Sequence, residues 1–225
     1  MPLAPAHPAV VLPLQRLGLP LSALVVGAVA PDAPVYLPVR VSYATTHGWQ
    51  GLPAVVVIGL VILCLWFALL RDAVVDLTPY LRGRAPSQAR LGRRAWLLAP
   101  LAVAVGAGSH VLWDSATHDY GFIARDLAFL REEYGPVPLY RWLQHLSTVA
   151  GSVVVAAYCA LRLSRRPVAP RPPAVRHPGL FLAPVPLAAL VVGIVWRDPE
   201  AGVGAALLAL LCVAIVWRVA RQPQP

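Results

Sequence analysis

Five long apolar segments constrain this chain more than any other feature of its sequence. A bilayer core about 30 Å thick is crossed by roughly 20 apolar residues in a helix. Only 13% of the 225 residues are charged, whereas a soluble domain usually carries about 25%. We therefore expect an all-α fold, a polytopic membrane bundle of about five transmembrane helices. The apolar segments are 53–70, 95–113, 147–163, 180–196 and 201–217.

The distribution of arginine orients these segments. All nineteen basic residues are arginine, and cytoplasmic loops of membrane proteins are enriched in basic residues. Most of them fall in 71–94, in 162–179 and in the tail after 217, which share one side if five spans alternate. We predict that these stretches, and hence the C-terminus, are cytoplasmic, and that 114–146 and 197–200 face outward. Arginines bunched between apolar segments indicate topology, so the net charge of +9 does not predict a nucleic-acid partner.

Residues 1–52 precede the first long segment and are placed outside by the same alternation. Pro13 and the break "RLGLP" divide them into two apolar pieces, each too short to cross a bilayer. This pattern predicts an N-terminal helical hairpin at the interface. A sixth, proline-broken span over 19–39 is the alternative.

The chain is expected to have three parts. A helical membrane domain carrying the candidate site covers 1–165, a Pro/Arg-rich cytoplasmic linker covers 166–179, and a pair of transmembrane helices covers 180–225. The turn "RDPE" between the last two apolar segments is short, so these helices should be antiparallel neighbours. Excess Arg, Ala and Pro is typical of GC-rich bacterial genomes, which favours a bacterial inner membrane as the location.

The three cysteines do not predict a metal or redox site. Their spacing fits neither a zinc knuckle nor a CxxC pair. Each lies inside an apolar segment, so we expect small core residues. They are Cys64, Cys159 and Cys212.

The stretch "SHVLWDSATHDY" at 109–120 places ionisable groups at the end of an apolar segment. His110, Asp114 and His118 recur every four residues, so at about 100° per residue they share one face of a helix. Ionisable side chains at membrane depth cost about 2.5–3.5 kcal/mol on insertion scales and tend to mark function. Histidine and carboxylate bind first-row metals, with zinc the default.

Five of the six histidines fall on the predicted outer side, and only His177 does not. Two aspartates, Asp32 and Asp114, fall there as well. A lone histidine near a helix end is more often an interfacial residue or a cap, but together these residues predict one site with one or two zinc ions. Asp32 or Asp114 would be a bridging ligand or a general base. The candidate metal ligands are His7, Asp32, His47, His110, Asp114, His118 and His145.

The segment 119–146 mixes aromatic residues with arginines and is expected to roof the site. Arg125, Arg131 and Arg141 could hold a phosphate group through paired hydrogen bonds. The alternative is an amphipathic interfacial helix whose arginines extend toward water.

Four motifs in this order resemble a bacterial membrane family, the domain-of-unknown-function family 4184. They cover roughly residues 1–165 and read "AHPAVVLPLQRLGLPLSALVVGAVAPD", "TTHGWQG", "SHVLWDSATHDYG" and "LYRWLQHLSTVAG". That family is similar in motif order to membrane-bound metal-dependent hydrolases, which look like distant relatives of zinc-dependent phospholipases C. The resemblance implies a helical His/Asp metal site at the seven positions above and hydrolysis of a phosphoester. The chain departs from the pattern at Gly48, where the family commonly has a hydroxyl residue, and at Ala116, where an aromatic residue is frequent.

Three functions are compatible with these features. The first is a membrane-embedded, metal-dependent hydrolase acting on a lipid or another phosphoester. The second is a non-enzymatic membrane protein with a structural metal site. The third is a metal or proton carrier, which is disfavoured because the middles of the spans are almost purely apolar, whereas a carrier needs polar groups there.

Overall fold

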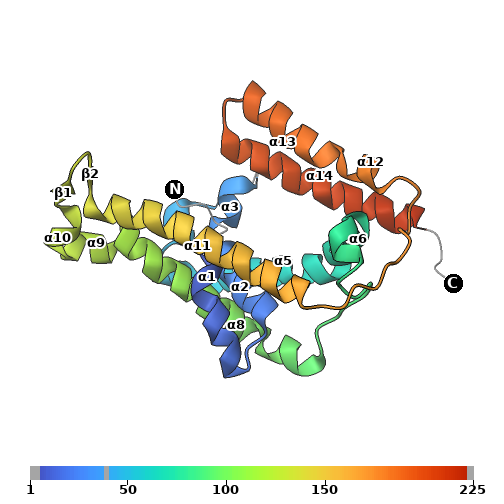
Figure 1. Cartoon of the computed structure of the whole chain (residues 1–225). Coiled ribbons are helices and arrows are strands. Elements are labelled where there is room, and N and C mark those ends of the chain that lie inside the picture. Colours follow the sequence, from blue (N-terminus) through green and yellow to red (C-terminus); the bar gives the residue numbers. More distant parts are fainter. Residues whose placement is uncertain (1–5, 38–40, 222–225) are drawn as a thin grey trace. The chain divides into compact units, whose positions relative to one another are not determined.

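The computed structural model describes residues 6–37 and 41–221 and is helical almost throughout (Figure 1). This confirms the predicted all-α fold. The chain divides into two compact units, which are described separately. The first unit comprises Met1–Pro34, Arg40–Leu63 and Gly92–Cys159, and the second comprises Val35–Val39, Cys64–Leu91 and Ala160–Pro225.

The first unit carries every candidate ligand predicted from the sequence. Two of its helices, α5 (Leu52–Leu65) and α11 (Leu139–Ser164), continue into the second unit, as does the short α3 (Ala33–Tyr36). Its other elements are α1 (Pro8–Val11), η2 (Leu12–Leu17), α2 (Leu21–Val29), η3 (Ala30–Asp32), α4 (Tyr43–Thr46), η4 (Trp49–Gly51), α8 (Arg93–Thr117), α9 (Phe122–Asp126), α10 (Ala128–Arg131), β1 (Glu133–Tyr134) and β2 (Val137–Pro138).

The N-terminal region forms the predicted helical hairpin. α1 and η2 lead to a turn at Gly18, whose φ of +78° is a left-handed conformation that glycine adopts without strain. The chain then returns through α2, which packs against α1. Near the other end of the unit, β1 and β2 form a small antiparallel hairpin that leads into α11 (Figure 1).

Two glycines allow α2 and α8 to pack at very short distance. A Cβ atom at Gly27 would collide with the backbone of Val103, and one at Gly106 would collide with the backbone of Leu24 and Ala28. Small residues permit this kind of close approach between helices in membranes. The crossing brings the C-terminal half of α8 against the end of α2, which positions the candidate site.

Five helical stretches of the described residues are long and apolar enough to cross a membrane. This confirms the predicted number of spans and indicates a multi-pass membrane protein. The apolar helix Leu21–Tyr36 is shorter than these five, so it does not support the alternative of a sixth span over 19–39, the end of which lies outside the described residues. The five are Trp49–Leu77, Arg93–Asp126, Leu139–Ser164, Pro178–Val195 and Pro199–Ala220.

The second unit packs around the last helix. Its core joins Ala73 and Leu77 to Val213, Ala214 and Trp217. The irregular stretch before α12 contains the predicted proline-rich linker. The elements of this unit are the π-helical turn η5 (Trp66–Leu70), α6 (Arg71–Leu77), α7 (Pro79–Arg82), α12 (Pro178–Leu182), α13 (Pro184–Val195) and α14 (Pro199–Ala220).

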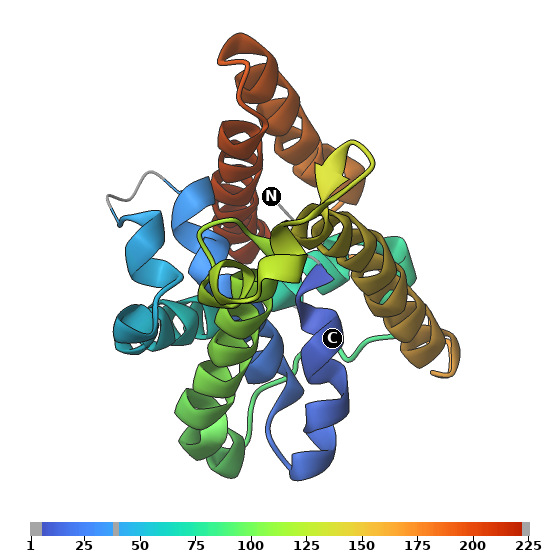
Figure 2. The same ribbon diagram turned by 90° about the vertical axis from the view of Figure 1, so that its left-hand side faces the viewer.

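Helices α13 and α14 are the predicted antiparallel neighbours (Figure 2). A Cβ atom at Gly202 would lie 2.7 Å from the carbonyl O of Ala189, so the two helices pack closely through small residues. Asp198 begins α14 by accepting hydrogen bonds from the backbone N–H groups of Glu200 and Ala201. This cap satisfies two of the amide groups that the start of a helix leaves unpaired.

The prediction that the cysteines are core residues was wrong. Cys64, Cys159 and Cys212 are all exposed on the surfaces of apolar helices. The exposed face of a membrane span meets lipid, which is as apolar as a protein core. An apolar segment is therefore apolar on both faces, and hydropathy alone does not distinguish core from lipid-facing positions.

Candidate metal centre

Six of the seven predicted ligands converge in the first unit. His7 precedes α1, Asp32 ends η3, His47 follows α4, and the other three come from α8 or the residue after it. Their side chains are at most 10% exposed. Buried charges are costly unless they are paired or bind a metal, so this concentration of titratable groups needs a specific partner. The six are His7, Asp32, His47, His110, Asp114 and His118.

Backbone carbonyls determine which nitrogen of two imidazoles faces the cluster. Nδ1 of His110 lies 2.8 Å from the carbonyl O of Ala28, and since a carbonyl only accepts, this nitrogen carries the proton. Nδ1 of His47 lies 3.2 Å from the carbonyl O of Tyr43 and 3.0 Å from Oγ1 of Thr46. In the neutral imidazoles both Nε2 atoms are therefore unprotonated, and they face each other at 3.2 Å. Two lone pairs at this separation repel unless a proton or a metal ion lies between them.

Two carboxylates lie near these imidazole nitrogens. Asp32 Oδ1 lies 3.2 Å from Nε2 of His47 and 3.6 Å from Nε2 of His110. Asp114 Oδ2 lies 3.7 and 3.4 Å from the same two atoms. Because zinc binds N and O ligands at about 2.0–2.2 Å, the ligand atoms of a tetrahedral ion are about 3.3–3.6 Å apart. The separations among Asp32, His47 and His110 are 3.2–3.6 Å, close to that spacing, and these three residues could hold a metal ion.

Asp114 also faces two other imidazoles. Its Oδ1 atom lies 3.6 Å from Nε2 of His7 and 3.7 Å from Nδ1 of His118. His7 Nε2 and Asp114 Oδ1 are buried without a hydrogen-bond partner, although buried polar atoms almost always have one. His7, His110 and Asp114 are close enough to hold an ion. The residues therefore fit one or two metal ions, with the two oxygens of Asp114 directed at different groups.

Burial suits His7 to metal binding. Desolvation, and then the neighbouring imidazole of His110, lower the pKa of His7 to about 4. The His7 ring stacks on that of His110, with their centroids 3.8 Å apart. At neutral pH the side chain is therefore the neutral imidazole, which is the form that binds a metal.

His118 lies at the edge of the cluster and belongs to neither ligand group. Its Nδ1 donates to the carbonyl O of Asp114 at 3.2 Å, and its Nε2 accepts from the side-chain amide of Gln144 at 2.9 Å. Both ring nitrogens of His118 thus have protein partners, and its contact with Asp114 helps to hold that residue in place.

His145 does not join the other six residues. It is exposed on α11, and it is in neither ligand group of the described residues. One residue along a helix corresponds to about 100° of rotation, so the neighbouring residue Gln144 occupies the face that reaches His118. The sequence motif "QHL" identified the right turn of the helix, but Gln144 was not predicted as a site residue.

A cavity of about 590 Å³ adjoins the ligands and is lined by His47 and Asp114 among others. Tyr43 stacks on His47 with ring centroids 3.6 Å apart, and its hydroxyl lies 2.5 Å from that of Tyr120. Burial and the Tyr120 hydroxyl raise the pKa of Tyr43 above its usual range, so its phenol stays protonated and can donate a hydrogen bond. Tyr120 belongs to the segment 119–146 that was expected to roof the site, but Tyr43 was not predicted from the sequence, although it stands four residues before His47, the spacing at which side chains meet on a helix.

Of the three arginines expected to bind substrate, Arg125 lines this cavity. Arg131 and Arg141 are exposed and are not among its lining residues. Arg131 ends α10, and Arg141 lies in the first turn of α11 beyond the β hairpin. The segment after His118 therefore contributes to the cavity mainly through its first part, up to α9.

A second cavity, of about 470 Å³, reaches the ligand groups at His7. It lies along α1, α8 and α11, and most of its wall is apolar. Exposed wall residues include Val10, Leu146 and Val154. The candidate ligands are thus reached by one cavity with polar groups in its wall and by another that is mainly apolar.

The five apolar helices and the buried His/Asp groups define a multi-pass helical membrane protein with a candidate metal centre. A family model for a domain of unknown function, DUF4184, matches residues 1–222. The chain belongs to this family, and the match extends over the C-terminal helices that the four sequence motifs did not reach. Comparisons with curated proteins and with solved structures gave no significant match.

Proposed function

We propose that this chain is a zinc-dependent hydrolase embedded in a bacterial inner membrane, and that its substrate is a phosphoester of a lipid or another amphiphile. One observation carries the proposal. The Nε2 atoms of His47 and His110 and the carboxylate of Asp32 lie close enough together to hold a metal ion, and Asp114 Oδ2 lies within 3.7 Å of both imidazole nitrogens.

The cavity beside these residues favours catalysis over a purely structural metal. Structural zinc sites are closed by four protein ligands, whereas catalytic sites keep a position open. His47 and Asp114 both line a cavity of about 590 Å³, which lies within the usual range of about 300–1,000 Å³ for ligand pockets. The ligands therefore border a space in which a substrate could bind.

The candidate ligands would have different roles in the reaction. When bound, zinc would supply Lewis-acid chemistry that polarises a phosphoryl oxygen. Asp114 would hold both ligand groups together, since its two oxygens face different imidazoles. Asp32 faces the imidazoles through Oδ1, so its other oxygen would accept the proton of the attacking water, while the bond from phosphorus to the leaving oxygen breaks and that oxygen takes a proton from solvent.

The cavity wall would recognise the substrate. Arg125 could donate two parallel hydrogen bonds to a phosphate group, the geometry in which arginine binds phosphate most strongly. The protonated Tyr43 could donate a third. The mainly apolar cavity at His7 could take an attached hydrocarbon chain, which supports an amphiphilic rather than a soluble substrate.

The proposed topology places the C-terminus in the cytoplasm and the metal centre at the outer interface. It follows from the alternation of five spans and the arginine-rich stretches. Contacts of the second unit support it, because residues 169–171 hydrogen-bond to residues 82–85, and Asp76 accepts hydrogen bonds from both Ala174 and Trp217. These residues come from, or directly precede, the three stretches assigned to the cytoplasmic side.

The test combines metal analysis with hydrolysis. Wild-type protein in detergent should contain at least one equivalent of zinc and should hydrolyse bis(p-nitrophenyl) phosphate. Asp114→Asn should lose about 100-fold or more of both metal affinity and activity, since it removes a ligand that faces both groups. His145→Ala is the matched control and should stay within about twofold, because His145 is exposed.

The outcomes separate the alternatives. Zinc bound without any hydrolysis, with Asp114→Asn losing zinc and thermal stability together, would assign the site a structural role. Wild-type protein that binds no stoichiometric transition metal would refute the hydrolase at its first step.

A further inference from the structure

The arginine-rich stretches meet in the second unit. The proline-rich linker binds the turn after α7, where the backbone N–H of Ala169 donates to the carbonyl O of Gly83 at 2.8 Å. The Arg171 guanidinium donates to the carbonyl O atoms of Arg82 and Ala85, both at 2.7 Å. These bonds fix Arg171 in one orientation.

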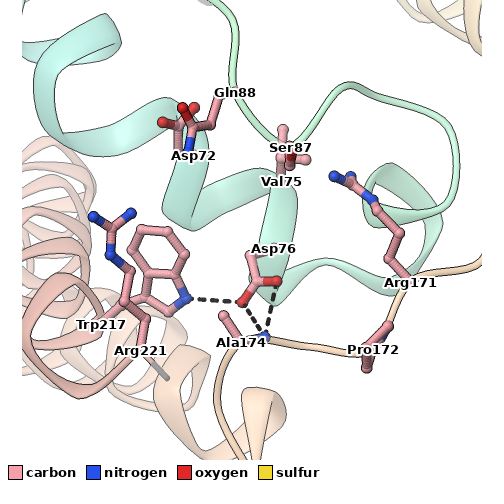
Figure 3. Close-up of a pocket in the computed structure, with 10 residues that line it drawn as sticks. All are labelled: Asp72, Val75, Asp76, Ser87, Gln88, Arg171, Pro172, Ala174, Trp217 and Arg221. Atoms are coloured by element: carbon pink, nitrogen blue, oxygen red, sulfur yellow. Dashed lines mark hydrogen bonds between the residues drawn. The ribbon is translucent and has the colours of Figure 1, made fainter. Parts of the chain in front are cut away.

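Asp76 of α6 connects the end of α14 to the proline-rich linker. Its carboxylate accepts from Nε1 of Trp217 at 2.8 Å and from the backbone N–H of Ala174 at 3.1 Å. Figure 3 shows Asp76 between these two partners, at the side of a cavity of about 460 Å³. The cavity is lined by Asp72, Val75, Asp76, Ser87, Gln88, Arg171, Pro172, Ala174, Trp217 and Arg221.

The charges around this cavity favour an anion. Asp72 is paired with two arginines, Arg71 at 2.7 Å and Arg90 at 2.9 Å. Arg171 and Arg221 also line the cavity, and neither forms an ion pair with any carboxylate of the described residues. The Arg221 guanidinium lies over the ring of Trp217, 5.5 Å from its centroid. Two guanidinium groups and two carboxylates line the cavity, and two further guanidinium groups, those of Arg71 and Arg90, neutralise Asp72, so the net charge around the cavity is positive.

The position and the remaining lining indicate a lipid. Trp217 lies in the last turns of α14, an apolar helix long enough to span the membrane, and tryptophan at the end of a span marks the headgroup level. Val75, Pro172 and Ala174 add apolar wall beside the arginines. Basic pockets between transmembrane helices bind anionic headgroups. We propose that this cavity binds the phosphate group of an anionic phospholipid.

The experiment is native mass spectrometry of the full chain in detergent, titrated with dioleoyl phosphatidylglycerol or dioleoyl phosphatidylcholine. Wild-type protein should bind one phosphatidylglycerol about fivefold or more tightly than phosphatidylcholine. Arg221→Gln should remove most of this preference. Arg218→Gln is the matched control, because Arg218 is exposed in the last turn of the same helix and does not line the cavity.

Three results would overturn the proposal. Equal binding of the two lipids would show that the cavity does not select an anion. If Arg218→Gln and Arg221→Gln lost the preference for phosphatidylglycerol equally, that preference would come from the surface charge in general and not from this cavity. Inorganic phosphate that displaces phosphatidylglycerol at the same concentration would identify a free-phosphate site instead. None of these results depends on the metal centre.

Discussion

The crossing of α2 and α8 allows a direct test of how the candidate metal centre is positioned. A Cβ atom at Gly106 would lie 2.8 Å from the backbone N of Ala28, whereas ordinary contact begins at 3.4 Å. Gly106→Ala must therefore move the end of α2 away from α8 by about 0.6 Å or more. Ala28 is also the residue whose carbonyl O accepts from His110, so that hydrogen bond would lengthen from 2.8 Å to about 3.4 Å.

The expected cost has two components. Overpacking a tight contact costs about 1–3 kcal/mol, and the weakened hydrogen bond about 1 kcal/mol more. Gly108→Ala is the matched control on the same helix, since its Cβ would meet only Trp49 at 3.7 Å. Both variants gain the same helix propensity. Gly106→Ala should therefore be about 2–4 kcal/mol less stable than Gly108→Ala.

Unfolding in detergent and a zinc competition titration measure the two effects. Loss of the contact that orients the His110 ring should weaken metal affinity by about tenfold or more in Gly106→Ala, and Gly108→Ala should match the wild type. If the two variants are equally stable and bind zinc equally, the close crossing does not position His110, and this reasoning fails.

Thr46→Val keeps the shape of the side chain but removes the hydroxyl that lies 3.0 Å from Nδ1 of His47. This variant should bind zinc about tenfold more weakly, as measured by competition with a chelator. An unchanged zinc affinity would show that this contact does not orient His47. Removing zinc by dialysis against EDTA should lower the melting temperature of the protein, and adding zinc back should restore it. Zinc at 100 times its dissociation constant stabilises the folded state by about 2.7 kcal/mol. A melting temperature that does not change with zinc would contradict this prediction. A reporter fused after Arg221 should be cytoplasmic and one inserted at Gly135, between β1 and β2, should be outside, and both reporters on the same side would refute the proposed topology.

Much of the fold and the centre could be predicted because helical periodicity and hydropathy are local signals. The i, i+4 spacing of His110 and Asp114 indicated a shared face, and their side-chain atoms lie 3.4 Å apart. Counting spans predicted that His7, Asp32 and His47 lie on the same side of the membrane as the end of α8 that carries His110 and Asp114. In the structure all three side chains lie close to these two residues.

The remaining features depend on how helices rotate and pack, which a single sequence does not show. The face of α11 that reaches His118 carries Gln144 and not His145, a difference of about 100°. Tyr43 and Tyr120 are 77 residues apart in the chain, and no local pattern pairs them. Likewise, residues 64–91 group with the C-terminal helices through contacts distant in sequence.

The candidate ligands come from distant parts of the chain, and this has a consequence for biogenesis. His47 and His110 are 63 residues apart, and His7 and Asp32 come earlier still. During synthesis, the amino-terminal ligands emerge well before α8 exists to meet them. Both candidate ligand groups include His110 of α8, so a metal ion could be bound only after that helix has inserted into the bilayer. Metal binding would therefore be a late step in the assembly of the protein.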